Sequence, residues 1–481
     1  MSAAAASSPA AIATRASVLI VGGGLAGLAA AAALAPRGVA VTLLESKRRL
    51  GGRAGSFVDR QTGELFDHCQ HVAMGCCTNY LDFCWQTEIA GHFARFESLT
   101  FFGPDGRPSP FRGRKWLPAP LHLMPALLGL KYLSLGDKIA LCRAILRLVA
   151  TPTIDSVTSP TVLAWLTSLR QPSRVIERFW KVVLVSALGE SLDRASLAAA
   201  RKVLVDGFLA HRDASDVFVP QVSLGELYDQ RVADWLRSRG VRVLLETAAE
   251  EGLADEGRAS GVRLADGSIL EADFVVLAVP WRKALALIPE RIAPRLPLLA
   301  AARDFAAAPI SSLHLWFDRP ITNLPHAVLV ERMSQWIFAR PGHATGGGHA
   351  YQVVISASHD LAGRERQAIV EEVQGELAGI FPAAKSARLL RWQLVTEQEA
   401  VFSVRPGLDE LRPPQETAIE NLLLAGDWTR TGWPATMEGA VRSGYLAAEG
   451  VLRKLGRPEQ ILAAGLPRGR LLRWFIPGGG R

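Results

Sequence analysis

Residues 18–53 of the chain are VLIVGGGLAGLAAAAALAPRGVAVTLLESKRRLGGR, and this stretch decides the fold. The apolar run 18–21 predicts a buried parallel strand, and Gly22, Gly24 and Gly27 form a G-x-G-x-x-G turn that opens an alanine-rich helix. Glycines at these positions allow a tight turn, close approach of the backbone to a pyrophosphate, and close packing of the helix on the strand. Because phosphates bind at the positive N-terminus of such a helix, the stretch predicts a dinucleotide-binding unit.

The residues that follow complete this unit. The helix is expected to end at the Pro-Arg-Gly of residues 36–38, and a second strand is expected over 39–44. Glu45 stands at the end of that strand, about 20 residues beyond the motif, where an acid binds a free ribose 2′-hydroxyl. An acid there disfavours NADP and leaves FAD or NAD. The candidate contacts are Gly22, Gly24, Leu25, Ala26, Gly27, Glu45 and Ser46.

Composition favours an enzyme with a large core. The chain has 481 residues and is 49% hydrophobic, which is enough for two or three domains. Its net charge of +8 is spread in short clusters without zinc-finger spacing, an RNA-binding signature or a basic helix, so no nucleic-acid partner is expected. The five cysteines form no C-x-x-C, so neither a disulfide framework nor a metal site is expected.

Two further segments resemble a large flavoprotein group that includes amine oxidases, protoporphyrinogen oxidase and phytoene desaturases. The first is Leu50-Gly51-Gly52-Arg53-Ala54, and the second is NLLLAGD at 421–427 with a helix expected over 436–454. In that group the first segment lies along FAD and the second closes the FAD site, whereas the alternative for the first is a surface turn. The resemblance implies FAD as cofactor and adds these contacts: Gly51, Gly52, Arg53, Thr247, Ala248, Gly426, Asp427, Trp433, Thr436, Met437 and Ala440.

The same resemblance implies specific roles at the C-terminal motif. Asp427 is expected to bind ribityl hydroxyls, or phosphate through water. The helix that begins near Thr436 and Met437 is expected to aim its positive end at the flavin N1 and C2 carbonyl edge. Trp433 either walls the flavin pocket or fills the core.

The predicted fold class is α/β: a discontinuous Rossmann-like FAD-binding domain with an inserted α+β substrate-binding domain that has a helical part and a sheet lobe. Strands are expected at 241–245, 258–264, 269–272, 274–279, 311–317, 327–330, 335–339 and 352–356. Helices are expected at 138–149 with Asp137 as cap, and at 160–169, 172–187, 227–239 and 364–380. The expected parts are a disordered leader (1–16), FAD-binding parts (17–110, 224–285 and 415–458), substrate-domain parts (111–223 and 286–414) and a tail (459–481).

A narrower resemblance covers roughly residues 17–455 and concerns the squalene-associated FAD-dependent desaturases, that is, the hydroxysqualene dehydroxylases of hopanoid synthesis. It is carried by DHCQH (67–71), MGCC (74–77), the helices of 165–196, FVPQVSL (218–224), GDWT (426–429) and TGWPATMEGA (431–440). The resemblance implies an isoprenoid lipid substrate, hydroxysqualene, which reduced FAD converts to squalene by giving hydride to the allylic cation left when the C–O bond breaks.

Loss of hydroxide requires an acid, and the cation requires a dry channel. Asp67, His68 and His71 are the candidate proton-handling cluster, although an adjacent Asp and His are often a structural hydrogen-bonded pair. Glu438 is either a second acid or a cap. The rival functions are a carotenoid or phytoene desaturase, a flavin oxidase acting on amines, and a non-catalytic prenyl-lipid escort protein.

The remaining expectations concern partners and location. Only one G-x-G-x-x-G unit is present, so the electrons are expected from an unknown external donor. The leader lacks a secretion signal and no stretch supplies about 20 uninterrupted apolar residues, which predicts a cytoplasmic protein. A lipid substrate predicts docking on the inner face of the cytoplasmic membrane through 117–132 or through 471–476 with Arg468, Arg470 and Arg473, whereas core packing or a disordered tail is the alternative.

Overall fold

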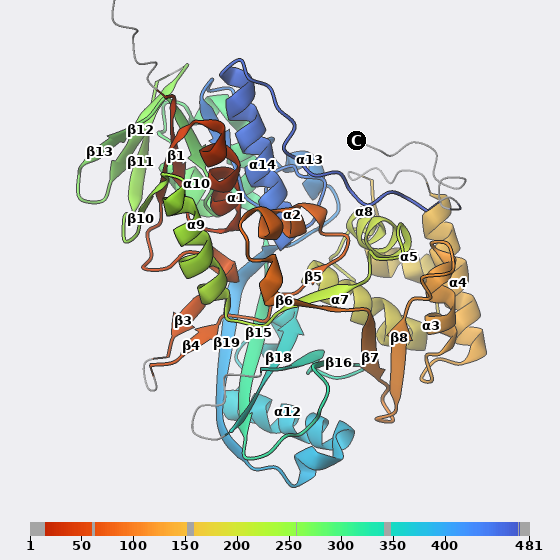
Figure 1. Ribbon diagram of the computed structural model, residues 1–481. Coiled ribbons are helices and arrows are strands. Elements are labelled where there is room, and N and C mark those ends of the chain that lie inside the picture. Colours follow the sequence, from red (N-terminus) through yellow and green to blue (C-terminus); the bar gives the residue numbers. More distant parts are fainter. Residues whose placement is uncertain are drawn as a thin grey trace, which may run out of the picture.

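The structure is a computed structural model that describes residues 15–59, 63–151, 158–255, 257–340, 348–469 and 471. Residues 1–14 of the expected leader (1–16) and the tail positions 470 and 472–481, including Arg470, Arg473 and most of 471–476, lie outside these residues. Figure 1 shows a parallel sheet with its helices, a large mixed sheet below it, and a group of helices to one side.

A five-stranded parallel sheet forms the dinucleotide-binding domain, in the order β10-β2-β1-β14-β20. The strands come from three distant parts of the chain, so the predicted discontinuous Rossmann-like domain is confirmed. Their apolar residues are buried because helices cover both faces of a parallel sheet. The bounds are β1 Ser17–Val21, β2 Ala40–Leu44, β10 Arg242–Leu244, β14 Phe274–Leu277 and β20 Leu422–Leu424.

Two helices pack against each other on this sheet and join the ends of the chain. They are α1 Leu25–Leu34, in which every residue is buried, and α14 Met437–Lys454 (Figure 1). A Cβ atom added at Gly444 of α14 would lie 2.3 Å from the Ala26 carbonyl oxygen of α1. Glycine at 444 therefore sets the close approach of the two helices. The helix α2 Thr78–Gln86 packs beside α14.

The helix and strands predicted over 227–279 also form, with one added strand. The helical segment Glu226–Val232 continues into α9 Ala233–Ser238, and β14 returns to the parallel sheet. β11 Ala249–Ala254, which the sequence did not predict, pairs with β12 Ala259–Leu264, and β12 pairs with β13 Ile269–Glu271. The helices α10 Trp281–Leu287 and α11 Pro297–Ala301 follow.

A seven-stranded sheet of the order β19-β15-β18-β17-β16-β7-β8 forms the sheet lobe. α12 Arg366–Ile380 covers one face through Ile369, Val373 and Leu377, which cluster with Leu313 and Val353 of the sheet (Figure 1). Two strands of this sheet, at 98–102 and 108–112, come from the predicted FAD-binding part 17–110 or directly follow it. The domain boundaries stay a prediction. The strands are β7 Ser98–Phe102, β8 Pro108–Arg112, β15 Ala307–Phe317, β16 His326–Leu329, β17 Trp336–Ala339, β18 His349–Ser356 and β19 Leu389–Phe402.

The helical part packs on the other face of this sheet, where the Trp336 indole donates to the Ser186 hydroxyl at 2.9 Å. One predicted cap is wrong: Ser134 caps α4, and Asp137 at the third helical position completes the capping box by accepting from the Ser134 backbone. The helices are α3 Met124–Leu128, α4 Leu135–Ala150, α5 Val162–Ser168, α6 Ser173–Val175, α7 Lys181–Leu188 and α8 Leu197–Arg201, with π-helical segments at Ile176–Trp180 and Lys202–Leu209.

Short elements complete the fold. β3 Ser56–Val58 pairs with β4 Leu65–Asp67, and β9 Val217–Pro220 pairs with β5 Ala73–Met74 and β6 Phe93–Phe96. The helix α13 Leu408–Leu411 precedes β20. Among the helices in the described ranges, none is long and apolar enough to cross a bilayer.

Candidate active site

The glycine-rich turn brings the start of α1 close to two strands. A Cβ atom at Gly22, whose φ is +113°, would lie 2.4 Å from the Ala278 carbonyl oxygen, and one at Gly27 would lie 1.9 Å from the Gly22 carbonyl oxygen. At Gly24 the nearest atom to such a Cβ is the Gly52 Cα, at 3.9 Å. Within the described residues no side chain caps α1 at Gly24. The turn therefore leaves the first amides of α1, including those of Leu25 and Ala26, without a side-chain cap, which is the arrangement in which a helix N-terminus binds a pyrophosphate.

The second predicted FAD segment lies directly against this turn. The Gly51 amide donates to the Gly23 carbonyl at 2.8 Å, and Gly24 and Gly51 form an isolated parallel bridge. Gly52, with φ +59°, would bring a Cβ atom to 3.1 Å from the Gly24 Cα. Residues 51–53 thus lie against the glycine-rich turn rather than forming a surface turn. We call residues 22–27 and 51–53 together the cradle.

An ion pair closes the cradle from the C-terminal side. Arg53 Nη2 lies 2.6 Å from Asp427 Oδ1, and Arg53 Nη1 donates to the Ala400 carbonyl of β19 at 2.9 Å. Burial alone would lower the pKa of the Arg53 guanidinium, but the adjacent Asp427 carboxylate raises it above its usual value. The Gly426 amide donates to the Ser443 hydroxyl of α14 at 2.7 Å. The two ends of the chain therefore meet at one site.

The predicted adenosine-side residues lie together where β2 and β10 end. Glu45 accepts from the amides of Gly23 and Lys47, each at 2.9 Å, and its own carbonyl accepts from the Thr247 amide at 2.9 Å. The Ser46 hydroxyl donates to the Glu45 carboxylate at 3.2 Å, and the Ala248 carbonyl accepts from the Ala265 amide at 2.9 Å. Glu45 thus braces the glycine-rich turn; its contact with ribose stays a prediction.

The first turn of α14 is ordered by its own residues. Thr436 caps the helix by accepting from the Gly439 amide at 3.0 Å, Met437 Sδ accepts from the Tyr228 hydroxyl at 4.0 Å, and the Ala440 carbonyl accepts from Ser443. Trp433 contacts Lys202, whose Nζ lies 5.2 Å from the ring centroid, and lines a cavity of about 430 Å³. Trp433 therefore faces a cavity rather than the core.

Asp67 is held by three partners at the end of β4. Its carboxylate accepts from the Ser56 hydroxyl at 2.6 Å and the Leu224 amide at 2.9 Å, and it pairs with Arg340 Nη2 at 2.7 Å. The same guanidinium donates to Gln70 Oε1 at 2.6 Å. These contacts tie residues 67–70 to the end of β17, and a part for Asp67 in proton transfer stays a prediction.

The two histidines beside Asp67 are not hydrogen-bonded to it. His71 Nδ1 donates to the Cys69 carbonyl at 2.9 Å, which leaves Nε2 as the nitrogen that can take up or release a proton. His68 packs against Phe57 with ring centroids 5.2 Å apart. Burial lowers the pKa of both imidazoles, and nearby Lys47 lowers that of His68 further.

Glu438 belongs to the first turn of α14, and its side chain reaches the N-terminus of α2. Its fully buried carboxylate accepts from the Tyr80 amide at 2.8 Å and from Asn79 Nδ2 at 2.9 Å, and Arg442 is 3.8 Å away. Burial raises the pKa of this carboxyl above its usual range. Of the two alternatives for Glu438, these contacts favour the cap, here of α2.

The sequence analysis did not identify a row of polar side chains on the face of the seven-stranded sheet that is opposite α12. We call this the inner face. His314 of β15 stands opposite Gln352 of β18 and Gln393 of β19. Within the described part of the chain, the Oε1 atoms of both glutamines are buried without a hydrogen-bond partner. The alternation Ser312, His314, Trp316 along β15 was the available signal, because it places three non-aliphatic side chains on one face.

Metal and disulfide chemistry have no counterpart in the part of the chain that the structure describes. There, no group of three or more His, Cys, Asp or Glu residues could hold a metal ion. The five cysteines are free.

Comparison with known proteins agrees with this geometry. Residues 25–452 match the model of the flavin containing amine oxidoreductase family. The chain is 29% identical over 451 residues to hydroxysqualene dehydroxylase of Rhodopseudomonas palustris, covering 90% of this chain and 98% of that protein. It is 25% identical over 468 residues to 15-cis-phytoene desaturase of Solanum lycopersicum, covering 93% of this chain and 80% of that protein.

Solved structures share the fold. Cyclohexylamine oxidase from Brevibacterium oxydans IH-35A superposes with a TM-score of 0.66 at 19% identity, over 92% of this chain and 100% of that chain. A triple mutant of putrescine oxidase gives a TM-score of 0.69 at 15% identity, over 92% and 99% of the two chains. FAD is therefore the cofactor, and the chain belongs to the flavin containing amine oxidoreductase family as an FAD-dependent oxidoreductase.

Proposed function

We propose that the protein catalyses the reductive dehydroxylation of hydroxysqualene to squalene, and so supplies a precursor for hopanoids or sterols. The similarity to hydroxysqualene dehydroxylase over nearly that whole protein supports this substrate. The observation that carries the proposal is the histidine-bearing segment 67–71, which Arg340 holds at the end of β17 through Asp67 and Gln70, while the His68 amide donates to the Gly55 carbonyl beside residues 51–53. Reduced FAD, when bound, supplies the hydride.

The substrate loses hydroxide and gains hydride, so the balanced reaction consumes one proton and releases water. His71 is the proposed proton donor. With Nδ1 committed to the Cys69 carbonyl, a proton on Nε2 is the one available to the departing hydroxyl. Its lowered pKa makes the protonated ring a stronger acid but a scarcer one at neutral pH. His68 is the alternative donor, and Asp67 acts as a positioning residue.

The polar row supports a hydroxylated substrate over a hydrocarbon. The free carbonyl oxygens of Gln352 and Gln393 can each accept one hydrogen bond, from a substrate hydroxyl or from an ordered water. Phytoene carries no donor for them. Aromatic and apolar residues of the same face, including Trp316 and Val354, would keep bulk water from a cationic intermediate.

The second candidate function is desaturation of a phytoene-like carotenoid, which the relatives at about a quarter identity favour. It uses the same FAD cradle but oxidises its substrate. In either case a lipid substrate places the protein on the inner face of the cytoplasmic membrane, and an external donor or acceptor completes the redox cycle.

The test separates the two directions. FAD-loaded enzyme, reduced with dithionite without oxygen, is incubated with hydroxysqualene in detergent, and squalene is measured by gas chromatography and mass spectrometry. Oxidised enzyme with phytoene and a quinone is assayed in parallel. Squalene formation that is lost in His71→Ala but kept in the exposed-histidine control His349→Ala supports the proposal. Desaturated phytoene without squalene would refute it.

A further inference from the structure

The helix α4 exposes an apolar stripe on the side that faces away from the core. Leu135, Ile139 and Leu146 are 68%, 46% and 64% exposed. Their spacing places them along one side of a helix, while Leu141 and Leu148 are at most 1% exposed on the other side. A helix that packs against one core needs only one apolar face, so the outer stripe indicates a second surface that leaves water.

Neighbouring residues extend this stripe. Leu128 at the end of α3 is 53% exposed, and Lys138 of α4 donates to its carbonyl at 2.7 Å, which brings α3 beside the first turn of α4. Trp116 and Leu121, which precede α3, are 78% and 45% exposed. In Figure 1, α3 and α4 form the outer margin of the helical part, away from the parallel sheet. We call Leu128, Leu135, Ile139 and Leu146, with the cations between them, the α3–α4 face.

The charge around this face is almost entirely positive. Residues 112–151 contain seven Lys or Arg residues and one acid, Asp137, whose side chain is buried in the cap of α4. Lys138, Arg143 and Arg147 lie on α4 itself. Apolar side chains flanked by cations are the composition that binds anionic lipid headgroups and the adjoining acyl region.

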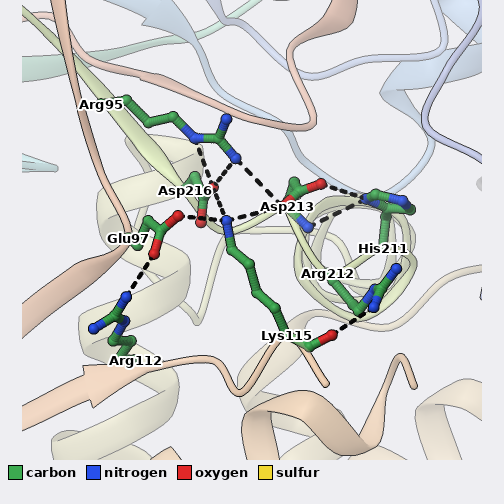
Figure 2. A network of polar contacts seen from close by, with 8 residues as sticks. All are labelled: Arg95, Glu97, Arg112, Lys115, His211, Arg212, Asp213 and Asp216. Atoms are coloured by element: carbon green, nitrogen blue, oxygen red, sulfur yellow. Dashed lines mark hydrogen bonds and ion pairs between the residues drawn. The ribbon is translucent and has the colours of Figure 1, made fainter. Parts of the chain in front are cut away.

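A network of ion pairs holds residues 112–115, which precede α3, against the rest of the protein (Figure 2). Lys115 Nζ lies 2.6 Å from Glu97, 3.0 Å from Asp213 and 3.2 Å from Asp216, and Arg112 pairs with Glu97 at 2.7 Å. These acids neutralise the cations at the start of the segment and join it to β6 and β9. The cations further along are Lys131, between α3 and α4, and the three cations of α4, and all of them are at least partly exposed.

We propose that the α3–α4 face docks on the surface of an anionic lipid bilayer. The proposal rests on the proposed function in that a thirty-carbon substrate is drawn from the membrane. It adds α4 to the segment 117–132 that the sequence predicts as a membrane contact. A second copy of the chain fits this face less well, because a symmetric contact would bring the same cations together.

The test uses the full-length FAD-loaded protein and sedimentation with vesicles. Vesicles of phosphatidylcholine with about a third phosphatidylglycerol are compared with phosphatidylcholine alone. We expect binding to the anionic vesicles that weakens as salt rises from about 0.1 to about 0.5 M. The double variant Ile139→Ser/Leu146→Ser should bind at least about 10-fold more weakly. Arg143→Glu/Arg147→Glu should lose at least about 5-fold per cation.

The matched control is Ile269→Ser/Leu390→Ser, which removes two apolar side chains of similar exposure, 53% and 45%, on β13 and β19. It should bind like the original protein. Squalene formation in detergent is measured for every variant, so loss of docking is distinguished from loss of the reaction. Wild-type protein that stays in the supernatant, equal binding by all variants, or a dimer that the α4 variants dissociate would overturn the proposal.

Discussion

Removal of the Arg53 side chain tests whether the two ends of the chain jointly hold FAD. In Arg53→Met the Asp427 carboxylate, whose side chain is only 5% exposed, loses a partner at 2.6 Å. Breaking a buried ion pair by removing one partner costs about 3–5 kcal/mol. Arg53 is itself 30% exposed, so we expect the lower end, about 3 kcal/mol.

This energy translates into two measurable changes. Unfolding entropy of about 2.1 cal/mol/K per residue gives about 1 kcal/mol/K for 481 residues, so Tm should fall by about 3 °C if the chain unfolds as one unit. FAD is predicted to contact both segments that the pair joins. If most of the loss falls on the FAD-bound state, the Kd should rise by about 10- to 100-fold.

Flavin content, fluorescence titration of the apoprotein with FAD, and thermal unfolding measure these changes. The matched control is Arg37→Met, which removes an ion pair of the same 2.6 Å length to Glu459, a side chain that is 50% exposed. An exposed pair contributes less than about 1 kcal/mol, so the control should keep its FAD and its Tm within about 1 °C. If Arg53→Met retained FAD as tightly as the control, the ion pair would not close the cradle.

Four further outcomes are expected. Gly444→Ala should destabilise the protein by more than about 2 kcal/mol in denaturant unfolding, because its Cβ would meet the Ala26 carbonyl oxygen at 2.3 Å. Gly375→Ala, in α12 with no atom within 4 Å of the new Cβ, should instead stabilise by up to about 1 kcal/mol, so equal signs would contradict the packing argument. Because burial lowers the pKa of His71, kcat/KM for dehydroxylation should rise as the pH falls from about 7.5 to about 5.5; a profile identical in His71→Ala would exclude His71 as the donor. Burial raises the pKa of Cys69 to about 12, so native protein at about pH 8 should label at Cys69 far more slowly than unfolded protein, as mass spectrometry can test.

The parallel sheet was predictable because its signals are local. The strand, glycine turn and helix of residues 18–34 follow one another directly, and each element is apolar enough to be recognised alone. β19 was missed because its 14 residues, LLRWQLVTEQEAVF, place Arg391, Glu397 and Glu399 where an alternating core strand would be apolar. It is the edge strand of its sheet, so charged side chains are tolerated there.

The individual residues of the site could be predicted from the sequence, but the contacts between them could not. Arg53 and Asp427 were each expected at FAD, yet they are 374 positions apart and nothing in the sequence joins them. Asp67 was grouped with the neighbouring histidines because it precedes them, whereas its charged partner, Arg340, is 273 positions away. From the sequence alone, an Asp that transfers protons cannot be distinguished from an Asp that binds a guanidinium. The fold shows which side chains lie next to it.

The residues of the cradle do not determine whether the substrate is oxidised or reduced. The glycine turn, Arg53 and the first turn of α14 are predicted to surround FAD in the same way whether a substrate is oxidised or reduced, and the relatives of both kinds match most of this chain. A difference must therefore come from the groups that face the substrate. Oxidation of a polyene requires no proton donor to a leaving group, whereas dehydroxylation does. His71→Ala is thus expected to abolish squalene formation while leaving FAD binding and dithionite reduction intact, and a loss of all three would assign His71 to the cradle instead.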